Sequence, residues 1–293
     1  MTNMTTAAKS SDDARSAPRE PLPCLPRLAE VNNVDEVLRN VEQIIEWAIK
    51  VESHLGYFAA VYKRVTLAIR AAIEDGEFDD GDRVAQLDVA FAQRYFDALN
   101  AYFHPNECEG LTLPWQVAFV GDQDEQAVIL QHLMSAFTAH ISFDLGMACF
   151  TIAANSLDTL EDDFYRVNAV LCSQMPDMVD VMQRLSPEMR WTRRLIPDEL
   201  GLFDRILRKL RDGAWQFAVY MALHPENAAQ KRAHQLAWTA ALGAWYLQPP
   251  PWFTPFPVLV HEIAKHESDD IAGNIRALEA ISNAPAKLDK TYL

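Results

Sequence analysis

The fold is most constrained by one long apolar run, Ala127–Ala154, which carries ionisable side chains near its middle. The run is long enough to serve as a membrane span. However, His132, His140 and Asp144 would be costly in lipid, and so would Gln131. The run is therefore predicted to be a buried core helix, around which the rest of the chain has to pack.

The rest of the chain is predicted to be helical as well. Glycine is scarce, with 10 among 293 residues, and apolar residues recur at spacings of three and four rather than two. The predicted fold class is all-α: a single array of about eight helices with one long buried central helix at about 124–154. The first helix is expected to be capped by Asn33 or Asp35 and to end near Glu52. The others are expected at Tyr57–Ile73, Arg83–Phe103 with a cap at Asp80 or Asp82, about 124–154, Asp158–Leu185, Asp198–Leu223, Asn227–Leu247 and Val258–Ile281.

Three other segments are predicted to lie outside the helices. Residues 104–123 contain two prolines and two glycines and are expected to form a loop around the apolar segment Trp115–Val120. The segment Gln248–Pro257 is expected to be a rigid, polyproline-like link. Residues 1–26 lack the apolar core of a secretory signal and are predicted to be a disordered tail, which leaves 27–293 as a single helical domain.

The composition excludes some partners and favours one compartment. The net charge is −15 and the pI about 4.9, so the chain should repel nucleic acid phosphates and anionic membrane surfaces, and neither is expected as a partner. The four cysteines form no CxxC pair, which favours a reducing, cytoplasmic compartment. The seven tryptophans and the aromatic residues near Pro249–Phe256 would permit a homo-oligomer.

The candidate chemistry lies in the central helix. His140 and Asp144 are four residues apart and should share one helix face. An imidazole and a carboxylate at this spacing can bind a divalent metal, or the carboxylate can orient the imidazole for proton transfer. His132, two turns earlier, would extend a metal site to His132, His140 and Asp144, for zinc, iron or manganese. Alternatively, the pair is a structural hydrogen bond between packed helices.

Two functions follow from these alternatives. The first is a small-molecule enzyme with a buried His140/Asp144 site, which performs either a metal-assisted hydrolysis or a cofactor-free acid–base reaction such as a cyclisation, isomerisation or dehydration. Its substrate is expected to be a small hydrophobic molecule. The second is a non-catalytic helical module that binds a hydrophobic ligand or a protein partner, in which the pair is structural. No glycine-rich phosphate loop and no GxSxG motif is present.

A second group of polar residues lies near the C-terminus. His261, Glu262, His266 and Asp270 include the string HEIAKH, which has one residue more than the HExxH motif of zinc proteases. The two histidines are then about 140° apart on a helix rather than on one face. A solvated polar face is the favoured interpretation, with extra ligands for His140 and Asp144 as the alternative.

Five sequence blocks, in consistent order within about 57–280, resemble a bacterial family known as domain of unknown function 5995. The blocks are Leu87–Leu99, Trp115–Phe119, Gln131–Leu145, Asp163–Asn168 and Arg232–Trp238. The third block is the most specific, although an asparagine normally precedes its Ala-His-Ile string where this chain has Thr138. The family also usually has asparagine or a similar residue in place of Ser142.

The resemblance implies a helical fold and no particular reaction. It favours residues inside the recurrent blocks as members of the site. His140 and Asp144 are therefore the candidate catalytic residues. The candidate substrate-binding residues are Arg94, Tyr95, Phe137, Asn168 and Trp238, which combine block positions with aromatic side chains suited to an apolar cavity.

Overall fold

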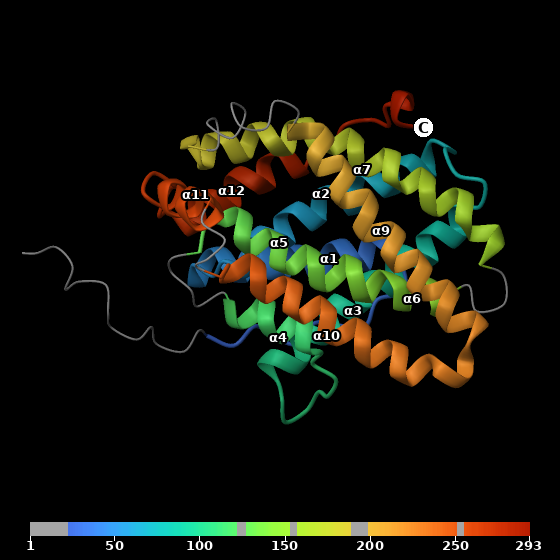
Figure 1. Ribbon diagram of the computed structural model, residues 1–293. Coiled ribbons are helices and arrows are strands. Elements are labelled where there is room, and N and C mark those ends of the chain that lie inside the picture. The colour runs from blue at the N-terminus through green and yellow to red at the C-terminus, as the bar shows by residue number, and fades with distance from the viewer. Residues whose placement is uncertain (1–22, 122–126, 153–156, 189–198, 251–254) are drawn as a thin grey trace, which may run out of the picture.

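The computed structural model describes residues 23–121, 127–152, 157–188, 199–250 and 255–293 (Figure 1). Within these residues the regular structure is helical and contains no strand, which confirms the predicted all-α class. The helices are α1 (Val34–Val51), α2 (Leu55–Glu74), α3 (Gly81–Phe103), α4 (Leu113–Val120), α5 (Ile129–Ala139), α6 (Gly146–Ile152), α7 (Asp158–Leu185), α9 (Glu199–Leu223), α10 (Ala228–Leu247), α11 (Pro255–Ala264) and α12 (Ile271–Ser282), with the π-helical segment η3 (His140–Leu145) and the short 3₁₀ segments η5 (Pro225–Asn227) and η6 (Lys290–Tyr292).

The central helix consists of α5, η3 and α6 in unbroken succession, and Figure 1 shows it in green through the middle of the molecule. Its first part packs on α2, α4 and α10, and its last part packs on α3 and α9. By length and composition Ile129–Ile152 could cross a membrane, but 83% of its most apolar window is buried by other parts of the chain. The prediction of a buried core helix is confirmed, although the helix begins at Ile129 rather than near 124, because residues 127 and 128 are not helical. The expected end at 154 lies outside the described residues.

Side-chain caps fix where two of the early helices begin. The Asn33 side chain accepts a hydrogen bond from the backbone N–H of Glu36 at 3.0 Å, and the Asp80 carboxylate accepts one from Arg83 at 3.0 Å. Each cap satisfies a backbone donor that the first helical turn leaves without a partner. Asn33 and Asp80, rather than Asp35 and Asp82, are therefore the caps. Helix α1 ends at Val51, and the C-cap residue Glu52, with a φ of 54°, turns the chain out of the helix.

The segment predicted as a loop around Trp115–Val120 is instead the short helix α4. Pro114 stands in its first turn, where the missing N–H costs nothing. Trp115 and Phe119, one turn apart, are both buried. The loop prediction failed because a helix of eight residues is too short to show a clear helical period.

The predicted last helix, Val258–Ile281, is also corrected, because it divides into α11 and α12. The break follows from a cap inside the polar stretch: the Asp270 carboxylate accepts a hydrogen bond from the N–H of Gly273 at 2.7 Å. This cap starts a new helix at Ile271. The polar residues 265–270 therefore form a connection between two helices.

The first described residues belong to the packed body of the protein. Leu25 and Leu28 are buried, and the Trp47 indole donates to the carbonyl of Pro23 at 2.9 Å. Residues 23–26 were predicted as the end of a disordered tail, and this part of the prediction is wrong. The rest of the predicted tail lies outside the described residues.

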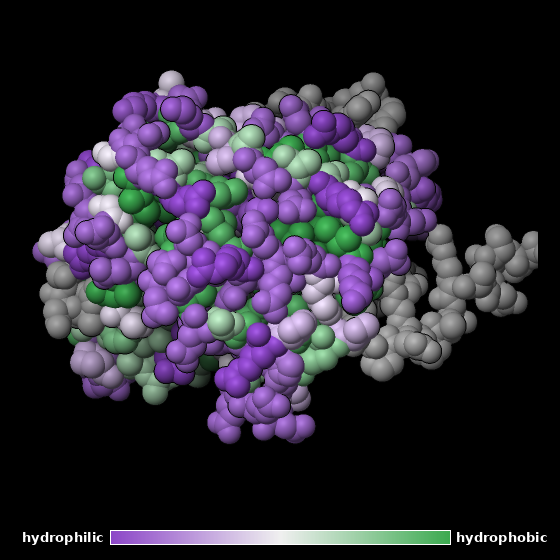
Figure 2. Space-filling view, turned by 180° about the vertical axis from the view of Figure 1, so that it is seen from behind, coloured by the Kyte–Doolittle hydropathy of each residue, from purple (hydrophilic) through white to green (hydrophobic). Residues whose placement is uncertain are grey.

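The apolar side chains are gathered inside, and the rear face of the molecule is mostly hydrophilic (Figure 2). Apolar side chains show there only as patches between polar ones. The loop between α3 and α4 projects from the bottom of the molecule as a hydrophilic lobe. The surface pattern is therefore that of a helical array around a central apolar core.

Gly146, directly after η3, allows α9 to approach the central helix closely. A Cβ atom at this position would lie 2.6 Å from the Phe217 ring and 2.8 Å from the carbonyl oxygen of Ala214. Gly146→Ala should therefore lower the free energy of unfolding by about 1–3 kcal/mol, the usual cost of overpacking. Urea denaturation measures the loss.

A matched control for this substitution lies on α9 itself. A Cβ at Gly213 would meet nothing within 4 Å. Gly213→Ala should therefore stabilise the protein by about 0.5–1 kcal/mol through helix propensity alone. Equal effects of the two substitutions would contradict the close approach of α9.

Candidate functional site

Asp144 is the centre of a buried hydrogen-bond network. Its Oδ1 accepts a hydrogen bond from Arg94 Nε at 2.9 Å, and its Oδ2 accepts one from Trp115 Nε1 at 2.7 Å. The same Oδ2 lies 3.3 Å from His140 Nδ1. The Asp144 side chain is only 2% exposed. The carboxylate thus joins residues of α3, α4 and the central helix.

The π-helical segment η3 places this network. It spans His140–Leu145, and all six of its residues are buried. A π-helical turn contains one residue more than an α-helical turn, and such turns occur frequently at functional sites. The residues that the sequence singled out, His140 and Asp144, occupy its first and fifth positions. The local geometry therefore departs from a regular helix where the candidate chemistry lies.

His140 is held between aromatic rings. Its imidazole stacks on Phe91, with ring centroids 3.6 Å apart and planes 9° apart, and meets the edges of Phe58 and Tyr62. The Asp144 carboxylate only accepts hydrogen bonds, so Nδ1 carries the proton and Nε2 keeps its lone pair. Burial lowers the pKa of His140 below 6.5, although the bond to Asp144 opposes this. The imidazole is therefore neutral at pH 7.

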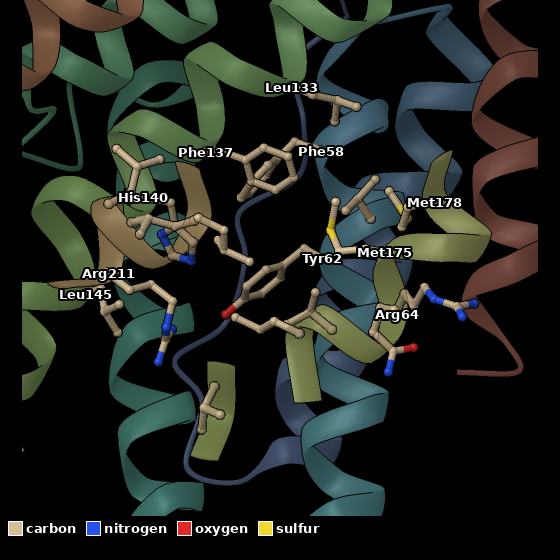
Figure 3. A pocket seen from close by; sticks show the side chains of 18 of the residues that line it. Phe58, Tyr62, Arg64, Leu133, Phe137, His140, Leu145, Met175, Met178 and Arg211 are labelled. Carbon is tan, nitrogen blue, oxygen red and sulfur yellow. The ribbon is translucent and has the colours of Figure 1, made fainter. Parts of the chain in front are cut away.

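A pocket of about 180 Å³ adjoins His140 and is lined almost entirely by apolar side chains (Figure 3). Four polar atoms of residues that line it are buried and have no hydrogen-bond partner within the described residues: His140 Nε2, the Tyr62 hydroxyl, Asp88 Oδ2 and Arg64 Nε. Figure 3 shows the Tyr62 hydroxyl pointing to the side of the pocket on which His140 and Arg211 lie. Buried polar groups without partners cost stability and call for an explanation.

Burial keeps the two acids beside the pocket, Asp88 and Tyr62, partly or wholly protonated near pH 7. Burial raises the pKa of Asp88 to about 7, so a large part of this carboxyl is protonated at neutral pH. Burial and the nearby Asp88 raise the pKa of Tyr62 well above its usual value of 10. The pocket therefore combines one unprotonated base, His140, with two groups that can donate a proton.

A second, polar cleft lies on the other side of Asp144. It encloses about 650 Å³ and is lined by Arg94, Trp115 and Asp144 together with polar residues of α3 and the loop before α4. The Arg94 side chain is 29% exposed. The Arg94–Asp144 ion pair thus separates the polar cleft from the apolar pocket. Asp144 borders the polar cleft, and its partner His140 borders the apolar pocket.

The predicted substrate-binding residues take different places. Phe137 lines the apolar pocket, whereas Tyr95 stacks on Trp115 behind His140. Arg94 faces the polar cleft. Asn168 is buried and accepts a hydrogen bond from Arg211 Nε, so it contacts a pocket residue without lining the pocket. Trp238 does not line the pocket: it is 53% exposed on α10, because the buried stripe of that helix passes through Thr239, Ala240, Gly243 and Leu247.

The predicted three-ligand metal set is not assembled. Eight residues of helix place His132 about 12 Å along the axis from His140, and its ring stacks instead on His54 at 4.4 Å. Among the described residues, no group of three or more His, Cys, Asp or Glu side chains is arranged to hold a metal. The alternative in which the C-terminal polar residues add ligands also fails, since His261, Glu262, His266 and Asp270 are exposed.

Tyr62 and Asp88 were not identified from the sequence as site residues, and the sequence did not place Arg211 beside the pocket. A signal was nevertheless present, because each is a polar residue at an apolar position of its own helix. Arg211 continues the stripe of Leu207, Ala214, Ala218 and Met221 on α9, and Asp88 lies between Val84 and Phe91 on α3. A charge on the buried stripe of an amphipathic helix is a candidate for function.

Comparison with known proteins identifies a family, but the function of that family is unknown. A family model described as "Family of unknown function (DUF5995)" matches residues 34–250. This range contains η3, the apolar pocket residues on α2, α3, α7 and α9, and the polar cleft residues Arg94, Trp115 and Asp144. No curated protein and no solved structure matches the chain significantly.

Proposed function

Since the chain belongs to the DUF5995 family, whose function is unknown, its activity has to be inferred from its own residues, and we propose that it is a small-molecule enzyme. In this proposal the apolar pocket binds a mostly apolar substrate, and His140 acts as a cofactor-free general base. The observation that carries the proposal is the unpartnered Nε2 of a neutral, buried imidazole beside a pocket.

The proposed step is a proton transfer within the pocket. His140 Nε2 takes a proton from a carbon of the substrate, and the resulting imidazolium is stabilised by Asp144 through Nδ1–H. Tyr62 or the protonated Asp88 returns a proton to another atom of the same substrate. Return to a second carbon gives an isomerisation, or a cyclisation where the carbanion first adds to a double bond of the same substrate. Return to the oxygen of a departing hydroxyl gives a dehydration, with water as the leaving group. Metal-assisted hydrolysis is disfavoured, because the predicted ligands do not converge within the described part of the chain.

The network around Asp144 supports this role. A carboxylate that holds the Nδ1–H of a histidine fixes the tautomer in which Nε2 is the base. Arg94 and Trp115 hold that carboxylate in place from two other helices. Asp88 and Tyr62 are retained as unpartnered buried groups, at a cost to stability that a role in proton transfer explains.

The test uses a probe that reports on a base in an apolar site. Nitrobenzisoxazole is small, uncharged and planar, and loss of one carbon-bound proton opens its ring to a coloured phenolate. The wild-type protein should open it much faster than free imidazole does at the same concentration and pH. His140→Asn should lose about 100-fold of this rate, within the range usual for a positioned base.

His132→Asn is the matched control, since His132 is also buried and lies on the same long helix but outside the apolar pocket. Its rate should equal that of the wild type. Equal rates in the wild type and His140→Asn would refute general-base catalysis. Binding of the probe by the wild type without any ring opening would favour the alternative function, a non-catalytic module for a hydrophobic ligand.

A further inference from the structure

Arg211 is a buried cation at the edge of the apolar pocket. It is 4% exposed and lies on the same side of the pocket as His140 (Figure 3). Burial lowers its pKa to about 10, so the guanidinium is still charged at pH 7. A buried charge is costly unless it is paired. It is therefore necessary to identify the group that pairs with this charge.

The protein positions Arg211 without neutralising it. Its Nε donates to Asn168 Oδ1, its Nη2 donates to the carbonyl of Phe164 at 3.0 Å, and the guanidinium lies over the Phe164 ring at 4.4 Å. These contacts use one edge of the guanidinium. Within the described residues, nothing accepts a hydrogen bond from Nη1, and no carboxylate forms an ion pair with Arg211.

The other arginine beside the pocket shows the contrast. Arg64, on the opposite side in Figure 3, forms an ion pair with Asp177 and donates to the carbonyl of Ile281. Its charge is neutralised within the protein. Arg211 has a neutral amide, a carbonyl and an aromatic ring as its partners, which fix its orientation and leave its charge available to a ligand.

We propose that Arg211 binds the carboxylate of an otherwise apolar ligand whose hydrocarbon part fills the pocket. This assignment names the substrate class and rests on the proposed use of the pocket as the substrate site. A single guanidinium matches a monoanion, whereas a phosphate dianion would leave one charge uncompensated in apolar surroundings. A water-sized group needs roughly 10–15 Å³ of such volume, so the pocket of about 180 Å³ has room for about a dozen non-hydrogen atoms. A medium-chain monocarboxylate has this size.

Calorimetric titration with three ligands of one chain length tests the proposal: decanoate, 1-decanol and decyl phosphate. Wild type should bind decanoate more tightly than decanol. Arg211→Met should weaken decanoate binding by about 10- to 100-fold, the usual range for charge-assisted hydrogen bonds, and leave decanol binding unchanged. Lys209→Met, which removes the same charge from an exposed position of α9, should leave both affinities unchanged.

Each other outcome also decides the question. Three results would overturn the proposal: the wild type does not bind decanoate, it binds decanol with equal affinity, or Lys209→Met loses as much decanoate affinity as Arg211→Met. Tighter binding of decyl phosphate than of decanoate would overturn the carboxylate assignment. If Arg211→Met loses both ligands because the pocket collapses, Arg211→Lys decides: a selective loss of decanoate supports the proposal, and an unchanged ratio overturns it. Decanoate binding does not require His140 as a base, and the ring-opening probe carries no carboxylate, so the two proposals fail separately.

Discussion

An Asp144→Ala variant should lose about 3–5 kcal/mol of unfolding free energy, the usual cost of removing one partner from a buried ion pair. The substitution would leave the indole N–H of Trp115 and the imidazole of His140 without their acceptor, and would leave the guanidinium of Arg94 without its counter-ion. Because native domains are stable by only about 5–15 kcal/mol, this is a large fraction of the total. Chemical denaturation followed by tryptophan fluorescence measures it.

Asp97→Ala is the matched control, because Asp97 is an exposed carboxylate on α3 whose hydrogen-bond donor is Gln93 of the same helix. It should change the stability by no more than about 0.5 kcal/mol. A loss below about 1 kcal/mol in Asp144→Ala would show that the three donors find other partners. Asp144 would then not be the group that fixes the tautomer of His140.

The second large effect concerns Asp88 and is an increase in stability. Burial raises the pKa of Asp88 in the folded state from 3.8 to about 7, so between about pH 4 and 7 the folded protein binds more protons at this site than the unfolded chain. The free energy of unfolding therefore falls as the pH rises through this range. At 1.36 kcal/mol per pKa unit, the full loss is on the order of 4 kcal/mol.

Asp88→Asn cannot ionise and should be free of this loss. Its stability should resemble that of the wild type at pH 4 and exceed it at pH 8 by several kcal/mol, up to about 4. Glu267, whose pKa burial also raises to about 7, is present in both proteins, so its contribution cancels in the difference. Urea denaturation at the two pH values is the measurement. A difference that does not grow with pH would mean that Asp88 is not an unpaired carboxyl in the folded protein.

A stabilising substitution at Asp88 would have a functional meaning. Proteins retain groups that reduce stability mainly where those groups act. If Asp88 returns the proton in the proposed reaction, Asp88→Asn should gain stability and lose the ability to convert the natural substrate. The ring-opening probe requires only a base, so its rate should fall less in this variant than in His140→Asn.

The fold class was predictable because local signals agree along the whole chain. Scarce glycine, apolar spacings of three and four, and polar residues that can cap helices such as Asn33 and Asp80 all indicate helices. Short helices and breaks were less predictable. The six residues between Pro114 and Gly121 are too few to show a clear period, and the cap at Asp270 looks in sequence like part of a charged helix surface.

The site was predictable only in part, because it is assembled from six helices: α2, α3, α4, the central helix, α7 and α9. Spacing alone brings His140 and Asp144 together within the central helix. Sequence spacing does not reveal that Trp115 of α4 and Arg94 of α3 bind the same carboxylate. It also does not reveal that Trp238 lies outside the buried face of α10. Tertiary packing decides these points, and an indication in the sequence was a charge on an apolar helix face, as at Asp88 and Arg211.

The π-helical turn has a consequence for comparing sequences within the family. It amounts to one inserted residue, which rotates the helix after it by about 100° relative to a regular helix. The first half of the central helix packs on α4 and α10, and the second half packs on α9. A family member that lacks one residue between the positions of Ala139 and Gly146 would have a regular helix there and would lose one of these two packing faces. A single-residue gap at this position of an alignment should therefore mark those members that cannot build the pocket.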